Sequence, residues 1–214
     1  MINNLKQSLY LKEMMNFSYE FSKYKPFIFY GSLLGICRDE NVINGDDDID
    51  FLVNFDFKNQ ILSEIIFSNK FIIDYSKSNN FFTSVYLYKK KIRINIDLYF
   101  YTDNLNDWYI NDRHNFFGEI NDKKKNFFIP KKLIFPLKKN KIFNHIFLPN
   151  AAEKLCEFLY GSDWKIPLKK NVRYKMTMSN NRPILIKLSF LSSLIRSLKI
   201  FLKKYFNPFH KFFI

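Results

Sequence analysis

Cysteine and glycine are scarce in this chain of 214 residues, which contains two cysteines and five glycines. Cys37 and Cys156 form no Cys-x-x-Cys pair and join no cluster with the spacing of zinc ligands, so neither a disulfide framework nor a structural zinc site is indicated. No stretch reaches the roughly 18 uncharged apolar residues of a membrane-spanning helix. Glu13 interrupts the apolar residues near the N-terminus, where an export signal would be continuous. We therefore expect a protein of the reducing cytosol, a cytoplasmic location.

Acidic residues are scarce only in the last third of the chain. The net charge is +14, but residues 1–120 carry 13 Lys+Arg against 16 Asp+Glu, whereas residues 121–214 carry 21 against 4. A bias in nucleotide composition would spread lysine evenly, so this asymmetry favours a basic surface built by the C-terminal third. Such surfaces bind nucleic acids or anionic membranes. The alternative is a lysine-rich face that is simply solvated.

Hydrophobic periodicity predicts both helices and strands, and hence an α/β (α+β) fold. With 47% hydrophobic and 25% charged residues, the chain has the composition of an ordinary globular protein. Its length allows one catalytic domain, residues 1–167, followed by a basic amphipathic extension, residues 168–214. Only short elements are expected between residues 102 and 150. The other predicted elements are an amphipathic helix that ends before Pro26, strands at 27–30, 48–53, 71–75 and within 82–101 around the turn 89–91, and helices from Leu33, at 57–69 and at 151–160.

A dense group of carboxylates follows the turn at residues 41–45. Its members are Asp46, Asp47, Asp48 and Asp50. Asp48 and Asp50 point to the same face of the predicted strand with Cα atoms roughly 6.5–7 Å apart, so both can reach one divalent cation. Such hard oxygen ligands suit Mg²⁺ or Mn²⁺, which keep coordination sites for phosphate oxygens. An acidic run is more commonly a solvated loop, but the alternation into Ile49 and Phe51 places these aspartates at a buried strand, where unpaired charge is costly. The pattern favours a metal site for phosphoryl transfer.

Asp97 is a candidate third carboxylate. The two-residue period of segment 92–99 places it on the face of its predicted strand that points away from the aliphatic residues. If this strand lies beside the one that carries Asp48 and Asp50, Asp97 completes the cluster as a third metal ligand or as a general base. Taken alone, Asp97 is equally well explained as an exposed strand residue or as a partner of Arg93.

The Gly31-Ser32 pair is predicted to form a turn that opens a helix. The backbone N–H groups and the positive end of the helix dipole at such a turn suit a phosphate of a donor, although a simple helix N-cap also explains the pair. Arg38, later in the same helix, is a candidate to neutralise charge on the leaving phosphate. Catalysis would then rest on positioning and charge neutralisation, as is usual for phosphoryl transfer.

Two ordered motifs bracket about residues 27–167. The first is Tyr30-Gly-Ser-Leu-Leu-Gly-x-x-Arg38 followed by Asp46-Asp-Asp-Ile-Asp50, and the second is Leu148-Pro149-Asn150, Leu155 and Tyr160-Gly161-Ser-Asp-Trp164-Lys-Ile-Pro167. Together they resemble the signature of the LicD/fukutin-like phosphotransferase family, a branch of the nucleotidyltransferase superfamily. The chain departs from the family pattern at Asn44-Gly45 and at Asp39, where Pro-Trp and a basic residue commonly stand.

The resemblance implies a nucleotidyltransferase-like fold, with a mixed β-sheet core flanked by helices, and a specific class of reaction. Members of the family move phosphocholine or a polyol phosphate from a CDP-linked donor to a sugar of a cell-surface glycan of the lipopolysaccharide, capsule or teichoic acid type. The implied roles by motif position are metal ligation by Asp48 and Asp50, auxiliary ligation by Asp46, and donor-phosphate contacts by Gly31 and Ser32. Asp97 matches the third carboxylate of the superfamily.

The C-terminal extension has its own pattern. Apolar residues recur at three- and four-residue steps from Ile184 to Leu202, flanked by basic residues such as Arg196 and Lys199. A basic amphipathic helix of this kind can lie on an anionic membrane, here the inner face of the plasma membrane, within reach of lipid-linked glycan acceptors. The same apolar stripe can instead pack on the catalytic core or on another subunit.

Two other functions stay open. A nucleotidyltransferase that uses a nucleoside triphosphate on a protein, RNA or small-molecule acceptor needs the same carboxylates, although the downstream Tyr160-Gly161 motif argues against it. A non-enzymatic basic protein that binds membranes explains the charge of the C-terminal third but leaves the aspartates without a role. Nucleic acid is the less favoured partner.

Overall fold

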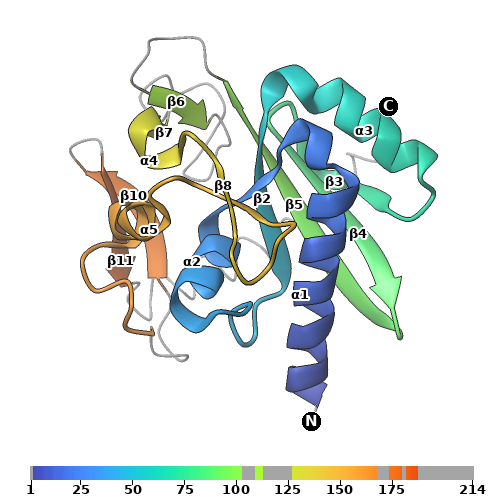
Figure 1. The fold of residues 1–214 in the computed structure, drawn as a ribbon, viewed down its shortest axis with the longest axis horizontal. Coiled ribbons are helices and arrows are strands. Elements are labelled where there is room, and N and C mark those ends of the chain that lie inside the picture. Colours follow the sequence, from blue (N-terminus) through green and yellow to red (C-terminus); the bar gives the residue numbers. More distant parts are fainter. Residues whose placement is uncertain (1, 103–108, 113–126, 168–173, 180–181, 188–214) are drawn as a thin grey trace, which may run out of the picture.

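The computed structural model of the chain describes residues 2–102, 109–112, 127–167, 174–179 and 182–187 (Figure 1). The helices are α1 (Ile2–Glu20), α2 (Tyr30–Asp39), α3 (Lys58–Phe67), α4 (Lys131–Ile134) and α5 (Ala152–Tyr160), with 3-10 turns at Ser22–Tyr24 and Phe55–Phe57. The strands of the main sheet are β1 (Phe27–Ile28), β2 (Asp48–Asn54), β3 (Ile72–Asn79), β4 (Phe82–Lys89), β5 (Ile92–Thr102), β6 (Tyr109–Asp112), β7 (Phe127–Pro130), β8 (Lys138–Lys139) and β9 (Phe147–Leu148). A separate hairpin of β10 (Tyr174–Ser179) and β11 (Arg182–Lys187) contacts α5 through β11.

The main sheet is mixed, and its strand order is β3–β4–β5–β2–β1–β9–β8, with β6 and β7 attached to the end of β5. β2 and β5 run parallel at the centre, whereas β4 and β1 run antiparallel to them on either side. Helices lie around this sheet (Figure 1). The predicted α/β fold, a mixed sheet flanked by helices, is confirmed.

One face of the central strands is aliphatic and lies against α1. Phe17 of α1 stacks on Phe51 of β2 with ring centroids 5.0 Å apart, and Ile49 and Phe51 pair in register with Ile96 and Leu98 of β5. All five side chains are fully buried. This apolar layer is part of the hydrophobic core formed by the described residues.

The predicted hairpin within residues 82–101 is confirmed. β4 and β5 pair along their full common length, from Phe82 with Tyr99 to Lys89 with Ile92. The turn between them uses Lys90 and Lys91, whose φ angles are 50° and 67°. The alternation along β5 is also as predicted from residue 93 onwards. Ile94, Ile96 and Leu98 are buried, whereas Arg93, Asn95 and Asp97 are partly exposed.

The predicted turn at Gly31-Ser32 is wrong, because the helix begins at Tyr30, three residues before the predicted start at Leu33. Phe29 is the extended N-cap of α2, and the amide of Leu33 donates to the Phe29 carbonyl at 3.0 Å. Tyr30 takes a positive φ of 38°, so the chain passes from strand to helix within one residue. Gly31 and Ser32 therefore lie in the first helical turn, whose N–H groups have no partner within the helix.

The C-terminal helix predicted from Ile184 is wrong at its start, where the structure has β11 paired antiparallel with β10. The run Ile184-Leu185-Ile186 is apolar, and its two isoleucines are β-branched, which suits a strand when a partner strand is available. The rest of that predicted helix, residues 188–214, lies outside the described residues. Over the ranges that the structure does describe, no helix combines the length and apolar character needed to cross a membrane.

Candidate functional site

The carboxylates of Asp48 and Asp50 on β2 meet that of Asp97 on β5 at the centre of the sheet. Asp50 and Asp97 are partners in the parallel register, and each of the three residues offers a carboxylate oxygen within 4.8 Å of the other two. Asp50 is the most enclosed, with 5% of its surface exposed. β5 therefore lies next to β2, which is the condition on which the prediction for Asp97 depended.

Burial and mutual repulsion raise the pKa values of this cluster. Burial raises the pKa of Asp48 to about 7 and that of Asp46 to about 6. The pKa of Asp50 lies well above its ordinary value, first because of burial and then because of the charges of Asp48 and Asp46. Burial also raises the pKa of Asp97. At neutral pH, ionisation of all the carboxyl groups in the cluster costs free energy unless a cation neutralises their charge.

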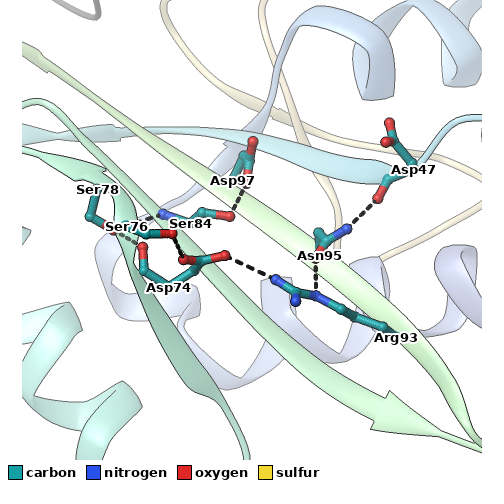
Figure 2. Close-up of polar contacts among 8 residues, drawn as sticks. All are labelled: Asp47, Asp74, Ser76, Ser78, Ser84, Arg93, Asn95 and Asp97. Atoms are coloured by element: carbon teal, nitrogen blue, oxygen red, sulfur yellow. Dashed lines mark hydrogen bonds and ion pairs between the residues drawn. The ribbon is translucent and has the colours of Figure 1, made fainter. Parts of the chain in front are cut away.

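Ser84 of β4 fixes the orientation of Asp97. Its hydroxyl donates a hydrogen bond of 2.6 Å to Oδ1 of Asp97 (Figure 2), and Ser84 is itself buried. The two residues are register partners across the β4–β5 pair. Because one oxygen accepts this bond, the other carboxylate oxygen of Asp97 is left to face the cluster.

The first turn of α2 packs directly on Asp50. The Asp50 amide donates to Oγ of Ser32 at 2.9 Å, and the Phe29 amide donates to the Asp50 carbonyl at 3.1 Å. A Cβ atom added to Gly31 would lie 3.0 Å from Oδ2 of Asp46 and 3.2 Å from Oδ2 of Asp50. Glycine at this position thus keeps space open beside two carboxylates. The predicted donor contact of Gly31 and Ser32 stays a prediction, but both residues border the cluster.

Three side chains distant in sequence hold the loop that carries Asp46 and Asp47. Lys6 donates to the Asp46 carbonyl at 2.7 Å, whereas Tyr10 and Asn95 donate to the Asp47 carbonyl at 3.1 and 2.8 Å. Sequence reasoning missed Lys6, Tyr10 and Ser84, because apolar periodicity locates elements but not the polar contacts between them.

Arg38 lies near the end of α2 opposite to Gly31. Its guanidinium binds Asp39 in a two-point contact, with Nε to Oδ1 at 2.9 Å and an Nη to Oδ2 at 2.8 Å. Asp39 is the residue that departs from the family pattern, so the departure supplies a local partner for the arginine. The predicted role of Arg38 towards a leaving phosphate stays a prediction.

Two tyrosines, the buried Tyr99 and the half-buried Tyr160, interact with the charge of Asp50. Burial raises the pKa of both Tyr99 and Tyr160, and the charge of Asp50 raises each further. Tyr99 also contacts Tyr30 with ring centroids 5.0 Å apart. Tyr160 belongs to the downstream sequence motif, and its helix α5 contacts α2, whose first turn packs on Asp50.

The donor set fits a hard divalent cation. The described residues contain two groups that could hold a metal ion, one of Asp48, Asp50 and Asp97 and one of Asp46, Asp47 and Asp48. Every donor is a carboxylate oxygen, the ligand type of Mg²⁺ and Mn²⁺. Asp48 is common to both groups and is therefore the central residue of the candidate metal site.

Comparison with known proteins agrees with this geometry. A family model described as "LicD/FKTN/FKRP, nucleotidyltransferase domain" matches residues 23–149, a range that contains the strands and all four candidate aspartates of the site. No curated protein matches the chain.

Proposed function

This chain belongs to the LicD/FKTN/FKRP nucleotidyltransferase-domain family, and from that premise we propose a metal-dependent phosphotransferase that moves a phosphorylated alcohol from a CDP-linked donor to a hydroxyl group of a cell-surface glycan. The family supports a transferase in general, and phosphocholine and polyol phosphates are the groups we propose for transfer. The observation that carries the proposal is the convergence of Asp48, Asp50 and Asp97 from two neighbouring strands.

The proposed reaction is one displacement at phosphorus. The acceptor hydroxyl oxygen forms a bond to the phosphorus that carries the alcohol, the bond from that phosphorus to the bridging oxygen breaks, and CMP leaves with the electron pair. Asp97 is the proposed acceptor of the hydroxyl proton, because it faces the cluster and its pKa is raised. Asp48, Asp50 and Asp97, with Asp46 as auxiliary, would hold Mg²⁺ or Mn²⁺, and Asp97 would keep its second role as proton acceptor. When bound, this ion supplies neutralisation of charge on the phosphate oxygens.

The donor is proposed to lie on the α2 side of the carboxylates. The first turn of α2 offers backbone N–H groups and a positive dipole end, and Gly31 keeps the space beside Asp46 and Asp50 open. Arg38 is the proposed counter-charge for the departing nucleotide. Residues 1–167 form the proposed catalytic unit, and the basic residues 168–214 the proposed contact with an anionic membrane at its cytoplasmic face.

The test is turnover of a donor panel with and without Mg²⁺ or Mn²⁺. We expect divalent-cation-dependent release of CMP from one of CDP-choline, CDP-glycerol and CDP-ribitol, and loss of that release in Asp48→Asn. Asp56→Asn is the matched control, because Asp56 is an exposed aspartate just beyond the other end of β2. Turnover of nucleoside triphosphates alone would replace the proposal by the nucleotidyltransferase alternative, and no turnover of any nucleotide would reject both.

A further inference from the structure

A polar network extends from the carboxylate cluster across β5, β4 and β3. Its side chains are Arg93, Asn95, Asp74 and Ser76, and we call them the Arg93 network (Figure 2). We propose that the Arg93 network is the subsite that binds a sugar ring of the acceptor. This inference rests on the proposed function, because it identifies where the second substrate of that reaction lies.

The strand register puts the network on the same face as the catalytic carboxylates. Asp97 pairs with Ser84, and Ser84 pairs with Asp74. Partners in a sheet project to the same side, so Asp50, Asp97, Ser84 and Asp74 form one row across four strands. Asn95 is the register partner of Asp48 in the next row. A ligand on the network would therefore reach the carboxylate cluster without crossing the sheet.

Arg93 is held in place before any ligand arrives. Its Nε donates to Oδ1 of Asn95 at 2.7 Å, and an Nη donates to Oδ2 of Asp74 at 3.0 Å. The guanidinium also lies 3.7 Å from the ring centroid of Tyr86, and the side chain is 37% exposed. These two bonds use two of the five N–H donors of an arginine, so three remain for a ligand within the part of the chain that the structure describes. A group that is already ordered loses little entropy on binding.

The charge of the network favours a neutral ligand. Ser76 donates to Oδ1 of Asp74 at 2.6 Å, and this bond together with Arg93 lowers the pKa of Asp74. Asp74 is therefore ionised at neutral pH and balances the charge of Arg93. A balanced pair offers fixed donors and acceptors but little net attraction for a phosphate, which matches the many hydroxyl groups of a sugar. Tyr88, with 58% of its surface exposed, adds an aromatic ring beside Tyr86, and such rings present an apolar body next to polar groups.

The position of the Arg93 network would also place the acceptor and the donor on opposite sides of the carboxylates. In the strand order β3–β4–β5–β2–β1, the network lies on the β5 side of the carboxylates, whereas α2 contacts β2. In phosphoryl transfer the attacking and leaving oxygens lie roughly in line on opposite sides of phosphorus. A donor next to α2 and an acceptor on the Arg93 network satisfy this geometry.

The experiment measures binding of methyl glycosides in the absence of any donor, so its outcome does not depend on whether CDP-linked compounds are turned over. The probes are methyl glycosides of glucose, galactose, N-acetylglucosamine and N-acetylgalactosamine, titrated into the full chain and followed by ligand-observed NMR. We expect at least one glycoside to bind. Its Kd should rise at least about tenfold in Arg93→Gln, the loss expected when one charged hydrogen bond is removed.

Three further variants keep the test decisive. Arg93→Lys retains the charge but not the planar fork, and should weaken glycoside binding nearly as much. Tyr88→Ala removes an exposed ring and is expected to fold normally while raising the Kd severalfold. Lys70→Gln is the control, because Lys70 forms a comparable exposed ion pair with Glu20 on α1, and should leave the Kd unchanged.

Several outcomes would overturn the proposal. These are the absence of glycoside binding up to the solubility limit, equal binding by wild type and Arg93→Gln when thermal melts show both folded, and displacement of the bound glycoside by inorganic phosphate, which would make the network an anion site. If a CDP-linked donor is turned over but no glycoside binds, the proposed function stands and only the proposal of an acceptor subsite at the Arg93 network is rejected.

Discussion

The two faces of the β2–β5 pair are built from alternate residues of the same strands, yet their side chains meet opposite environments. On the α1 face, Phe51 lies beside Leu98 in a fully buried apolar layer. On the other face, Asp50 lies beside Asp97, and burial raises the pKa of both carboxyl groups. Burial of apolar surface stabilises the fold, whereas burial of unpaired charge opposes it. One face thus supplies the stability on which the other, functional face depends.

The largest effect should come from neutralising the polar face. Asp50→Asn removes one of three converging carboxylates, so turnover should fall by at least the roughly hundred- to thousandfold that loss of one preorganised group costs an active site. The same change should raise the stability of the metal-free protein at pH 8, since it removes a buried charge that its neighbours repel. Steady-state CMP release and urea unfolding measure the two effects. If the variant is less stable and still active, Asp50 is a structural residue.

A substitution at the next residue, on the apolar face, should lower stability and leave activity nearly unchanged. Phe51→Ala leaves a cavity under α1 where Phe17 stacks at 5.0 Å, and should destabilise the protein by about 3–5 kcal/mol. At a temperature where the variant is folded, its kcat and its dependence on Mg²⁺ should stay within a few-fold of wild type. Urea unfolding and turnover at low temperature test this pair of outcomes. A loss of metal dependence in Phe51→Ala would show that the two faces are not separable.

The pH dependence of stability should distinguish the faces in the absence of metal. The pKa of Asp48 is about 7 in the folded chain against an ordinary value of 3.8, so its contribution to stability is fully present below pH 3.8 and is lost as pH rises through about 7. Each unit of such a shift corresponds to about 1.4 kcal/mol. Wild type should therefore lose stability relative to Asp48→Asn over this window. With saturating Mg²⁺, wild type and Asp48→Asn should show the same dependence of stability on pH. Urea unfolding midpoints, measured across this pH range with a chelator and with Mg²⁺, test both expectations.

The smallest expected effect is on the orientation of one ligand. Ser84→Ala removes the 2.6 Å hydrogen bond to Asp97 and should weaken Mg²⁺ affinity about tenfold, as loss of one hydrogen bond to a charged group predicts. Activity should return towards wild type at high Mg²⁺ concentration. Ser84→Thr, which keeps the hydroxyl, is the matched control. A defect in Ser84→Ala that excess metal does not restore would instead assign Ser84 a role in folding.

Local pattern was sufficient to predict the elements and part of the site. The spacing of Asp48 and Asp50 places both on one face of β2, and the two-residue period of β5 places Asp97 away from the aliphatic face. Neither pattern specifies that β5 lies next to β2, because strand order depends on contacts between segments distant in sequence. The adjacency was therefore only a condition of the prediction for Asp97, and the parallel register of β2 with β5 fulfils it.

The failures have physical causes of the same kind. The start of α2 was placed too late, because a positive φ at Tyr30 is uncommon for a residue with a side chain and has no sequence signal. Ile184 was assigned to a helix, although pairing with β10 makes it part of a strand. Lys6 and Tyr10 were missed because their contacts with the aspartate loop join segments that no local pattern connects.

The parallel pairing of β2 with β5 also has a consequence for how the protein is made. Parallel strands cannot be joined by a tight turn, and here a helix and two further strands separate the segment of Asp50 from that of Asp97. The β3–β4–β5 meander involves only local contacts and can form early, whereas the β2–β5 contact must await long-range loop closure. A nascent chain therefore has no complete cation site until β5 has been synthesised and docked. The proposed cation would bind only the native arrangement, so its presence would shift the last folding equilibrium towards the docked state by mass action.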